Sequence, residues 1–403
     1  IWGGEYKISG KTVSIKAVDY TQEIPAKGSI NLGYNFSSDD LDVEKYVLYV
    51  NDTQYSGDGL KMVASAPEKT DSNETSGGGK NTESAATEKK NNTNVPGEIP
   101  FETHGKLSVK GTDIVDMNGD KYQLKGVSTH GITWFPDYVN KEAFETLRDD
   151  WGANLIRLAM YTDTGDSYGY CSGGDKDEIL ALVDKGVSAA TELGMYVIVD
   201  WHILSDSDPN NHIDDAKEFF DKVSKKYAAQ ENVIYEICNE PNGGTQWSSV
   251  KSYAETIIPV IRANDKDALI IVGTPNWSQD VDIASQDPIT GYDNIMYAVH
   301  FYAATHKDDL RNKVKTALDN GLPVFVSEFS LCDASGNGGI DYDSSDEWFE
   351  LINENNLSYS SWSLCNKNET SALIKSDSTA TGSFSDGDLS DTGKYVRDRI
   401  MGK

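Results

Sequence analysis

Hydrophobic and polar positions over residues 101–403 alternate between two patterns. Short, strand-like apolar runs are followed by helix-length amphipathic segments. We expect strands at YQLKG (122–126), NLIRLAM (154–160), YVIVDW (196–201), VIYEIC (233–238), LIIVG (269–273), IMYAVHFY (295–302), PVFVSEF (323–329) and SYSSWSL (358–364). Helices are expected between them, over residues 141–151, 176–193, 213–227, 250–264, 307–320 and 346–355. Eight strands with intervening helices predict an α/β fold, the parallel (β/α)8 TIM barrel.

A doubly wound parallel sheet is the alternative fold for this pattern. It would need a glycine-rich phosphate turn after an early strand. The segment that follows YQLKG reads VSTHGITWF and lacks the G-x-G-x-x-G pattern, so the barrel is favoured.

The residues before this domain divide into two parts. Residues 1–62 contain alternating runs such as TVSIKAV and SINLGYNF, separated by Gly, Pro, Asn and Asp, and they predict a small antiparallel all-β segment. Residues 63–100 are almost free of aromatic and branched apolar side chains. Such a stretch buries too little surface to offset its ordering entropy, so we expect a flexible linker before the barrel domain at 101–403.

Composition excludes several classes of protein. Hydrophobic residues form 38% of the chain, enough for a large core, and the formal charge of −29 argues against a nucleic-acid partner, which would need clustered Lys and Arg. No apolar run reaches the roughly 18 residues of a membrane helix. The chain begins at Ile1 without a recognisable signal peptide, and its four cysteines lack zinc or disulfide-scaffold spacing, which predicts buried thiols.

Polar residues stand at or near the C-terminal ends of the predicted strands, where the active site of a barrel forms. Core packing does not explain such a set. It comprises Arg157, His202, Asn239, Glu240, His300, Tyr302, Glu328 and Trp362.

Two of these residues form a natural catalytic pair. Glu240 and Glu328 follow different strands, as the two carboxyl groups of a glycoside hydrolase do. We expect Arg157 and the hydroxyl of Tyr302 to keep Glu328 ionised as the nucleophile. Glu240, beside His202 and His300, would more easily hold a proton as the general acid. Asn239 is expected to hydrogen-bond the 2-hydroxyl of the substrate.

Seven phrases in order resemble glycoside hydrolase family 5, and within it the bacterial endoglucanase subfamily. They are LKGVSTHGITWFP, GANLIRLAMY, GMYVIVDWHI, VIYEICNEPNG, HFYAATH, PVFVSEFS and SYSSWSLCNKNETSA. The resemblance implies that Glu240 is the acid/base and Glu328 the nucleophile of a retaining mechanism, with carboxyl groups about 5 Å apart.

The resemblance also implies a substrate cleft. The positions that would hold sugar units are His130, Trp134, Tyr161, Trp277, Trp362, Lys367 and Glu369. Aromatic faces suit the apolar faces of pyranose rings, and charged tips suit their hydroxyls. The alternatives are that Trp134, Tyr161 or Trp277 are packing residues and that Lys367 and Glu369 form a surface ion pair.

The first segment resembles the closing strands of a family 2 type cellulose-binding module, from Tyr6 to Phe36. Only about half of such a module is present, so we expect weak or no cellulose binding by residues 1–62. Sugar-stacking and ordinary sheet packing remain alternative interpretations of Trp2, Tyr20, Tyr34, Tyr46 and Tyr49.

Together these patterns predict a secreted, extracellular endo-β-1,4-glucanase that hydrolyses cellulose and related β-glucans. We expect a monomer whose partner is a β-glucan polysaccharide or oligosaccharide, with no cofactor, no metal site and no membrane. One alternative keeps the mechanism but changes the substrate to mannan, xylan or xyloglucan. The other is a polysaccharide-binding protein whose barrel has lost activity.

Overall fold

The computed structural model describes residues 4–9, 12–17, 48–50, 53–55 and 96–403, which belong to two compact units, Ile1–Ala86 and Thr87–Lys403. The division falls within the predicted linker. Residues 63–95 of that linker lie outside the described residues.

The described part of the first unit consists of antiparallel strand pairs. Strand β1 (Gly4–Ser9) pairs with β2 (Thr12–Ala17), and β3 (Leu48–Val50) pairs with β4 (Thr53–Tyr55). The antiparallel pairing agrees with the alternating sequence pattern. The strand expected at 29–36 and the side chains of the five candidate stacking residues lie outside the described residues.

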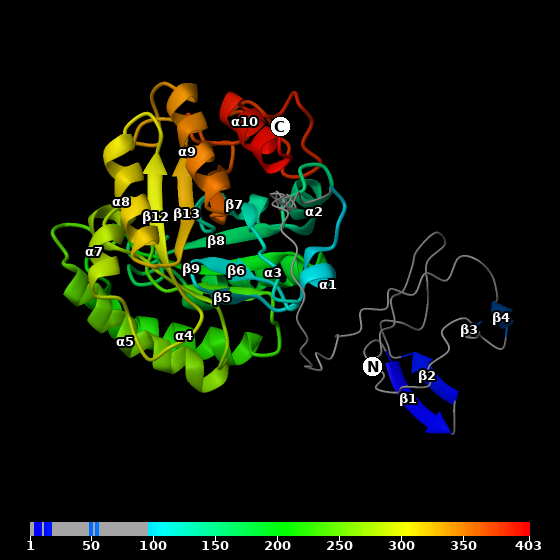
Figure 1. Cartoon of the computed structure of the whole chain (residues 1–403). Coiled ribbons are helices and arrows are strands. Elements are labelled where there is room, and N and C mark those ends of the chain that lie inside the picture. The colour runs from blue at the N-terminus through cyan, green and yellow to red at the C-terminus, as the bar shows by residue number, and fades with distance from the viewer. Residues whose placement is uncertain (1–3, 10–11, 18–47, 51–52, 56–95) are drawn as a thin grey trace, which may run out of the picture. The chain divides into compact units, whose positions relative to one another are not determined.

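The second unit contains a closed parallel barrel, which confirms the predicted fold (Figure 1). Each strand pairs with its neighbour in sequence, and β14 closes the ring against β7. The barrel strands are β7 (Lys125–Thr129), β8 (Leu155–Tyr161), β9 (Tyr196–His202), β10 (Val233–Glu236), β11 (Ile270–Val272), β12 (Ile295–Tyr302), β13 (Val324–Ser330) and β14 (Tyr359–Leu364).

Helices surround the barrel strands (Figure 1). The six predicted helices correspond to α2 (Lys141–Asp149), α3 (Lys176–Glu192), α4 (Ile213–Tyr227), α5 (Trp247–Asn264), α8 (Asp308–Asp319) and α9 (Tyr342–Glu354). Elements not predicted are α1 (Pro100–His104), η3 (Pro136–Tyr138), η4 (Pro209–His212), α6 (Pro275–Ser278), α7 (Val281–Gln286) and α10 (Asp391–Ile400). Within the described residues, no helix combines the length and the apolar character that crossing a bilayer requires.

The first barrel strand begins three residues later than predicted. The apolar residues Tyr122 and Leu124 pack beneath the barrel instead, and the backbone N–H of Tyr122 donates to the carbonyl oxygen of Ile114. A short hairpin formed by β5 (Ser108–Lys110) and β6 (Asp113–Val115) carries Ile114. The apolar run at 122–124 therefore belongs to the floor of the barrel.

This floor helps to determine where the site lies. Apolar side chains from the floor join inward-facing residues of the lower barrel in one cluster, including Leu155, Tyr196 and Ile234. A second, larger cluster fills the space between strands and helices. Because the N-terminal end of the barrel is closed by apolar packing, polar side chains gather at the other end.

Candidate active site

A cleft of about 750 Å³ opens at the C-terminal ends of the strands. Predicted site residues on its wall are His130, Trp134, Tyr161, His202, Glu240, Trp277, His300, Tyr302, Glu328, Trp362, Lys367 and Glu369. Two predicted residues, Arg157 and Asn239, lie fully buried behind this wall. The structure thus brings the predicted site residues, which are far apart in sequence, together at the C-terminal end of the barrel.

Arg157, on β8, connects the buried charges. Its Nη1 donates to Oε2 of Glu328 at 3.1 Å, and its Nε donates to Oε2 of Glu236 at 2.6 Å. Its Nη2 donates to Oδ1 of Asn239 at 2.6 Å and lies 3.1 Å from Oδ2 of Asp200. A buried guanidinium needs such partners, because an unpaired charge in this position would be strongly unfavourable.

Glu328, near the end of β13, accepts hydrogen bonds at both carboxylate oxygens. Arg157 occupies Oε2, and the hydroxyl of Tyr302 donates to Oε1 at 2.8 Å. Burial alone would raise the pKa of Glu328, but the charges of His300 and Arg157 and the bond from Tyr302 hold it below its usual value. The carboxylate is ionised and held in a fixed orientation, as a nucleophile requires.

Glu240 lies after β10 in a different environment. Burial, together with the nearby charge of Glu328, raises its pKa above the usual value. Its Oε1 lies 2.9 Å from Nδ1 of His300. Two carboxyl groups in one cleft therefore have pKa values displaced in opposite directions, which is the pattern of an acid and a nucleophile.

The proton positions around His300 follow from a buried relay. Ser327 donates its hydroxyl hydrogen to Oε1 of Glu236 at 2.6 Å, and Nε2 of His300 lies 2.9 Å from the same hydroxyl oxygen. Burial opposes the charge of Glu236, but Arg157 and His300 lower its pKa to about 2, so this carboxylate accepts and does not donate. Nε2 must then carry a hydrogen and donate it to Ser327.

This leaves one proton in the contact between Nδ1 of His300 and Glu240. If His300 is neutral, Nδ1 accepts from a protonated Glu240; if it is charged, Nδ1 donates to the carboxylate. Burial opposes charge on His300, but Glu236 and Glu240 raise its pKa to about 9. The site therefore holds a proton next to Glu240 at neutral pH.

His202 is held in a single neutral tautomer. Because Oδ1 of Asn239 accepts from Arg157, the amide nitrogen faces Nε2 of His202 at 3.2 Å and donates to it. Nδ1 of His202 then carries the hydrogen and donates to Asp200 at 2.6 Å. Burial and the charge of Arg157 lower the pKa of His202 to about 3, which agrees with a neutral ring.

The structure shows which protein groups Asn239 contacts, and its predicted hydrogen bond to the substrate 2-hydroxyl stays a prediction. Its amide nitrogen also donates to the carbonyl oxygen of Ile203 at 3.1 Å, so both amide hydrogens are used inside the protein. The residue is fully buried. In this structure Asn239 orients Arg157 and His202 from behind the wall of the cleft.

One side of the cleft is polar. Lys367 lies 2.7 Å from Glu369 and 3.4 Å from Nε2 of His130. The ion pair joins a half-exposed Lys367 (47%) to a buried Glu369 (8%), and both residues line the cleft. The ring of His130 packs against Trp362, with centroids 4.9 Å apart. Burial and Lys367 lower the pKa of His130 to about 3, so its ring is neutral.

Another side is aromatic. The ring of Tyr161 meets Trp134 edge-on at 4.7 Å between centroids and lies 4.1 Å from the ring of His202. Both Tyr161 and Trp134 are half-buried and line the cleft. Gly131 permits this approach, because a Cβ atom there would lie 2.5 Å from the ring of Trp134. The two rings pack against each other and also present surface to the cleft.

Trp277 is the most exposed aromatic residue of the cleft wall, with 45% of its surface accessible. Its φ of 57° lies in the left-handed region, as do those of its neighbours Asn276 and Ser278. The backbone N–H of Trp277 donates to the carbonyl oxygen of Pro241 at 2.9 Å, and the hydroxyl of Ser278 donates to the carbonyl oxygen of Asn239 at 2.6 Å. Strain of this kind persists where surrounding contacts enforce it and is typical of functional sites.

Sequence reasoning missed the buried acids behind the cleft, Asp200 and Glu236. Each stands within an otherwise apolar strand, YVIVDW and VIYEIC. A charged residue in a strand that is buried on both faces must be paired. An acidic residue within such an apolar run therefore indicates a buried ion pair. His306, which was not among the predicted site residues, also lines the cleft, and its Nδ1 accepts from the backbone N–H of Tyr302 at 2.8 Å.

All four cysteines are free thiols. Cys238, Cys332 and Cys365 are buried, and Cys171 is half-buried. Cys332 and Cys365, which follow neighbouring strands, each contact a serine hydroxyl two residues earlier in the chain.

Comparison with known proteins agrees with this geometry. Residues 115–368 match the family model described as cellulase, glycosyl hydrolase family 5. An endoglucanase of Clostridium saccharobutylicum is 48% identical over 74% of this chain and 65% of its own length. Endoglucanase A of Butyrivibrio fibrisolvens is 46% identical over 79% of this chain and 74% of its own length. The chain therefore spans about two thirds to three quarters of these relatives.

Solved structures show the same barrel. "Cellulase Cel5C_n" superposes with a TM-score of 0.71 at 43% identity, covering 75% of this chain and 93% of that one. The catalytic domain of Thermobifida fusca endoglucanase Cel5A gives a TM-score of 0.70 at 38% identity, covering 75% and 99%. A structure of that enzyme in complex with cellotetraose matches with a TM-score of 0.68. On the family match, these relatives and the two glutamates at the barrel end, the chain belongs to the cellulase family, glycosyl hydrolase family 5.

Proposed function

We propose that this protein is a secreted, retaining endo-β-1,4-glucanase that cleaves internal bonds of cellulose and related β-glucans. The observation that carries the mechanism is the spacing of Glu240 and Glu328. One oxygen of each lies within 4.8 Å of the other and of a nitrogen of His300. Retaining enzymes place their carboxyl groups about 5–5.5 Å apart, whereas inverting enzymes leave about 6.5–9.5 Å for a water.

In the first step Glu328 attacks the anomeric carbon. The bond between that carbon and the glycosidic oxygen breaks, and Glu240 transfers its proton to the departing oxygen. Tyr302 and Arg157 hold Glu328 in line for this attack, while His300 supports the proton on Glu240. The product is a glycosyl ester of Glu328 with a free sugar end released.

In the second step a water molecule attacks the same carbon. Glu240, now a carboxylate, takes one proton from the water as the new carbon–oxygen bond forms and the ester bond to Glu328 breaks. Both glutamates return to their starting protonation states. The sugar keeps the β configuration because inversion has occurred twice.

The substrate assignment rests on the shape and lining of the cleft. Trp134 and Trp277 offer ring faces for pyranose units, and Lys367 with Glu369 offers charged groups for hydroxyls. The names of the endoglucanase relatives and the cellotetraose bound to the Thermobifida fusca enzyme support a glucan.

Two variants test the mechanism, with Glu350→Gln in the exposed face of α9 as the matched control. Glu328→Gln should lower turnover of carboxymethylcellulose by more than about 1,000-fold, and Glu240→Gln by about 100- to 10,000-fold. On an aryl cellobioside with a good leaving group, Glu240→Gln should form the glycosyl ester at nearly the parent rate, because such a leaving group departs without being protonated. Near wild-type turnover by either variant on the polysaccharide would contradict the proposal.

The stereochemical outcome gives an independent check. Proton NMR of early product should show the β anomer first, and the α anomer appearing first would exclude retention. Reducing-sugar release from glucan, mannan, xylan and xyloglucan decides the sugar. Polysaccharide pull-down without hydrolysis would instead support a binding protein that has lost activity. The intact arrangement around Glu240 and Glu328 argues against that alternative.

Secretion and a monomeric state complete the proposal. The acidic balance of the chain suits a solubilising surface for an enzyme whose polymeric substrate is uncharged. Cell fractionation of the source organism and light scattering of the purified chain test the two points separately.

A further inference from the structure

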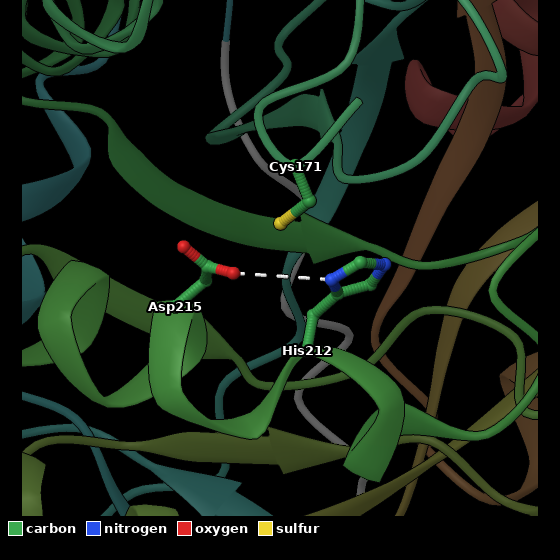
Figure 2. Close-up of side chains that lie close together, drawn as sticks. All are labelled: Cys171, His212 and Asp215. Carbon is green, nitrogen blue, oxygen red and sulfur yellow. Dashed lines mark ion pairs between the residues drawn. The ribbon is translucent and has the colours of Figure 1, made fainter. Parts of the chain in front are cut away.

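A second cluster of side chains lies apart from the catalytic pair, next to two loops that border the cleft. Cys171 belongs to the loop after β8, His212 ends η4, and Asp215 stands in the first turn of α4. One donor atom from each lies within 4.8 Å of the other two. Figure 2 shows the sulfur of Cys171 pointing toward the space between the Asp215 carboxylate and the His212 ring.

We propose that Cys171, His212 and Asp215 form a binding site for a divalent transition-metal ion of the Zn²⁺ class. Thiolate, imidazole and carboxylate are the ligand types that Zn²⁺ takes in proteins. Two such ligand atoms in a tetrahedral zinc site are about 3.3–3.6 Å apart. Nδ1 of His212 and Oδ2 of Asp215 are 3.8 Å apart, and the sulfur of Cys171 lies within 4.8 Å of a donor atom of each, so side-chain shifts of about 1 Å would bring the three ligands to these distances.

The surroundings of the three ligands match those of a metal site. Nε2 of His212, the nitrogen turned away from Asp215, lies 3.6 Å from Oδ2 of Asp163. Metal-binding histidines usually present their second nitrogen to a carboxylate, which fixes the ring and increases its basicity. Lys176 holds the other oxygen of Asp215, Oδ1, at 2.6 Å, so Oδ2 remains directed to the cluster.

The arrangement fits a metal better than it fits an acylating triad. In a Cys–His–Asp triad the imidazole stands between the thiol and the carboxylate, one nitrogen for each. Here the thiol and Asp215 both face one side of the ring, and a different carboxylate, Asp163, faces the other side. All three ligands are half-buried, which leaves room for a water as the fourth ligand.

The site joins two loops that form the cleft wall. The backbone N–H of Cys171 donates to the carbonyl oxygen of Thr162 at 2.7 Å, next to the wall residue Asp163. His212 follows the loop that carries the wall residues Leu204 and Ser205. A metal bound here would tie the two loops together and stabilise this part of the cleft, with the thiol proton released to solvent.

Sequence patterns gave no sign of this site. The only regular spacing is three residues between His212 and Asp215, and Cys171 is far away along the chain. The other metal-compatible set within the described residues, Glu240 with His300 and Glu328, is the catalytic site itself.

The test uses the full chain, reduced and stripped with a chelator that is then removed. We expect one Zn²⁺ per chain in competition with a chromophoric chelator. Co²⁺ bound in its place should give a thiolate-to-metal charge-transfer band in the near ultraviolet. Cys171→Ser and His212→Gln should each weaken Zn²⁺ binding by more than about 100-fold, beyond the roughly 10–100-fold typical of outer-shell changes, and Cys171→Ser should remove the band.

His104→Gln is the matched control, because His104 lies 3.0 Å from Asp116 and 3.5 Å from Glu98 without a thiol nearby. It should bind Zn²⁺ like the parent protein. Circular dichroism melting in chelator verifies that each variant folds, and slower reaction of the Cys171 thiol with a disulfide reagent upon adding Zn²⁺ tests the site in the unmodified protein. Zn²⁺ binding unchanged in both ligand variants, Co²⁺ binding without the band, or Zn²⁺ displaced by a cello-oligosaccharide would overturn the proposal.

Discussion

Nε2 of His300 donates a hydrogen bond of 2.9 Å to Ser327, whose own hydrogen is committed to Glu236. This single contact determines the proton count at the other end of the ring. With Nε2 protonated, the contact between Nδ1 and Glu240 holds one proton whichever partner carries it. A serine outside the cleft wall thereby helps to keep a proton next to Glu240, the proposed general acid.

Ser327→Ala should move the alkaline limb of the pH profile of kcat/KM to lower pH. Without the hydroxyl acceptor, the protonated ring of His300 loses stabilisation, and its pKa falls below about 9. A hydrogen bond to a charged group contributes about 1.5–3 kcal/mol, which corresponds to about one to two pH units. The measurement is kcat/KM against pH with a soluble cello-oligosaccharide.

The matched control is Ser361→Ala, a buried serine of β14 whose hydroxyl makes no hydrogen bond within the structure. Its alkaline limb should coincide with that of the parent protein. An unshifted limb in Ser327→Ala would mean that the relay does not determine the protonation of Glu240.

Tyr302→Phe should act on the acid limb. The proposed nucleophile, Glu328, must be ionised to act, and its lowered pKa keeps it ionised at a pH below the usual range of a glutamate. Removing the 2.8 Å bond from the hydroxyl to Oε1 raises this pKa, so activity should be lost at higher pH as acid is added. We expect a shift of about one unit with a 10- to 100-fold lower kcat.

Tyr342→Phe serves as the control for Tyr302→Phe, because Tyr342 is an exposed residue of α9. If the acid limb of Tyr302→Phe lies where that of Tyr342→Phe lies, the hydroxyl does not influence the ionisation of Glu328.

The barrel could be predicted from sequence because most of its strands are contiguous, largely apolar runs. The run IMYAVHFY gave β12 with its bounds unchanged, and the amphipathic pattern gave α4 likewise. The first strand was shifted because Tyr122 and Leu124 are as apolar as strand residues but pack in the floor. Periodicity reports burial and does not distinguish a barrel strand from the segment below it.

The candidate site divides in the same way. Strand-end residues such as Glu240 and Glu328 could be predicted because their position is determined by topology. The orientation of Asn239 could not, since it depends on which oxygen Arg157 approaches from another strand. The left-handed backbone at Trp277 likewise depends on a hydrogen bond to Pro241, which is distant in sequence.

Glu236→Gln should destabilise the protein in a pH-dependent manner. The folded-state pKa of Glu236 is about 2, below the ordinary value near 4.5, so its ionised form favours the folded state. This stabilisation is complete above pH 4.5 and is lost as pH falls toward 2. Breaking a buried ion pair costs about 3–5 kcal/mol, which is the difference in unfolding free energy that we expect at pH 7.

Urea unfolding at pH 7 and at acidic pH measures this difference, which should shrink as the pH decreases from 4.5 toward 2. Glu350→Gln, at the surface, should leave the free energy of unfolding within about 0.5 kcal/mol of the parent protein at both pH values. A gap between Glu236→Gln and the parent that does not change with pH would show that the lost stability is not due to the charge.

Replacing Trp277 by alanine or by glycine should lower activity to the same extent but leave proteins of different stability. Both Trp277→Ala and Trp277→Gly remove the exposed ring from the cleft, so each should lower kcat/KM on long β-glucans by about 10-fold while changing hydrolysis of a short aryl cellobioside less. Only glycine relieves the left-handed backbone at φ 57°. The glycine variant should therefore be about 1 kcal/mol more stable than the alanine variant. Thermal unfolding compares the two variants directly, since neither retains the ring. Equal melting temperatures would mean that the side chain does not strain the turn. An equal loss of kcat/KM on long β-glucans and on the aryl cellobioside would mean that the Trp277 ring acts near the bond that is cleaved and does not bind more distant sugar units.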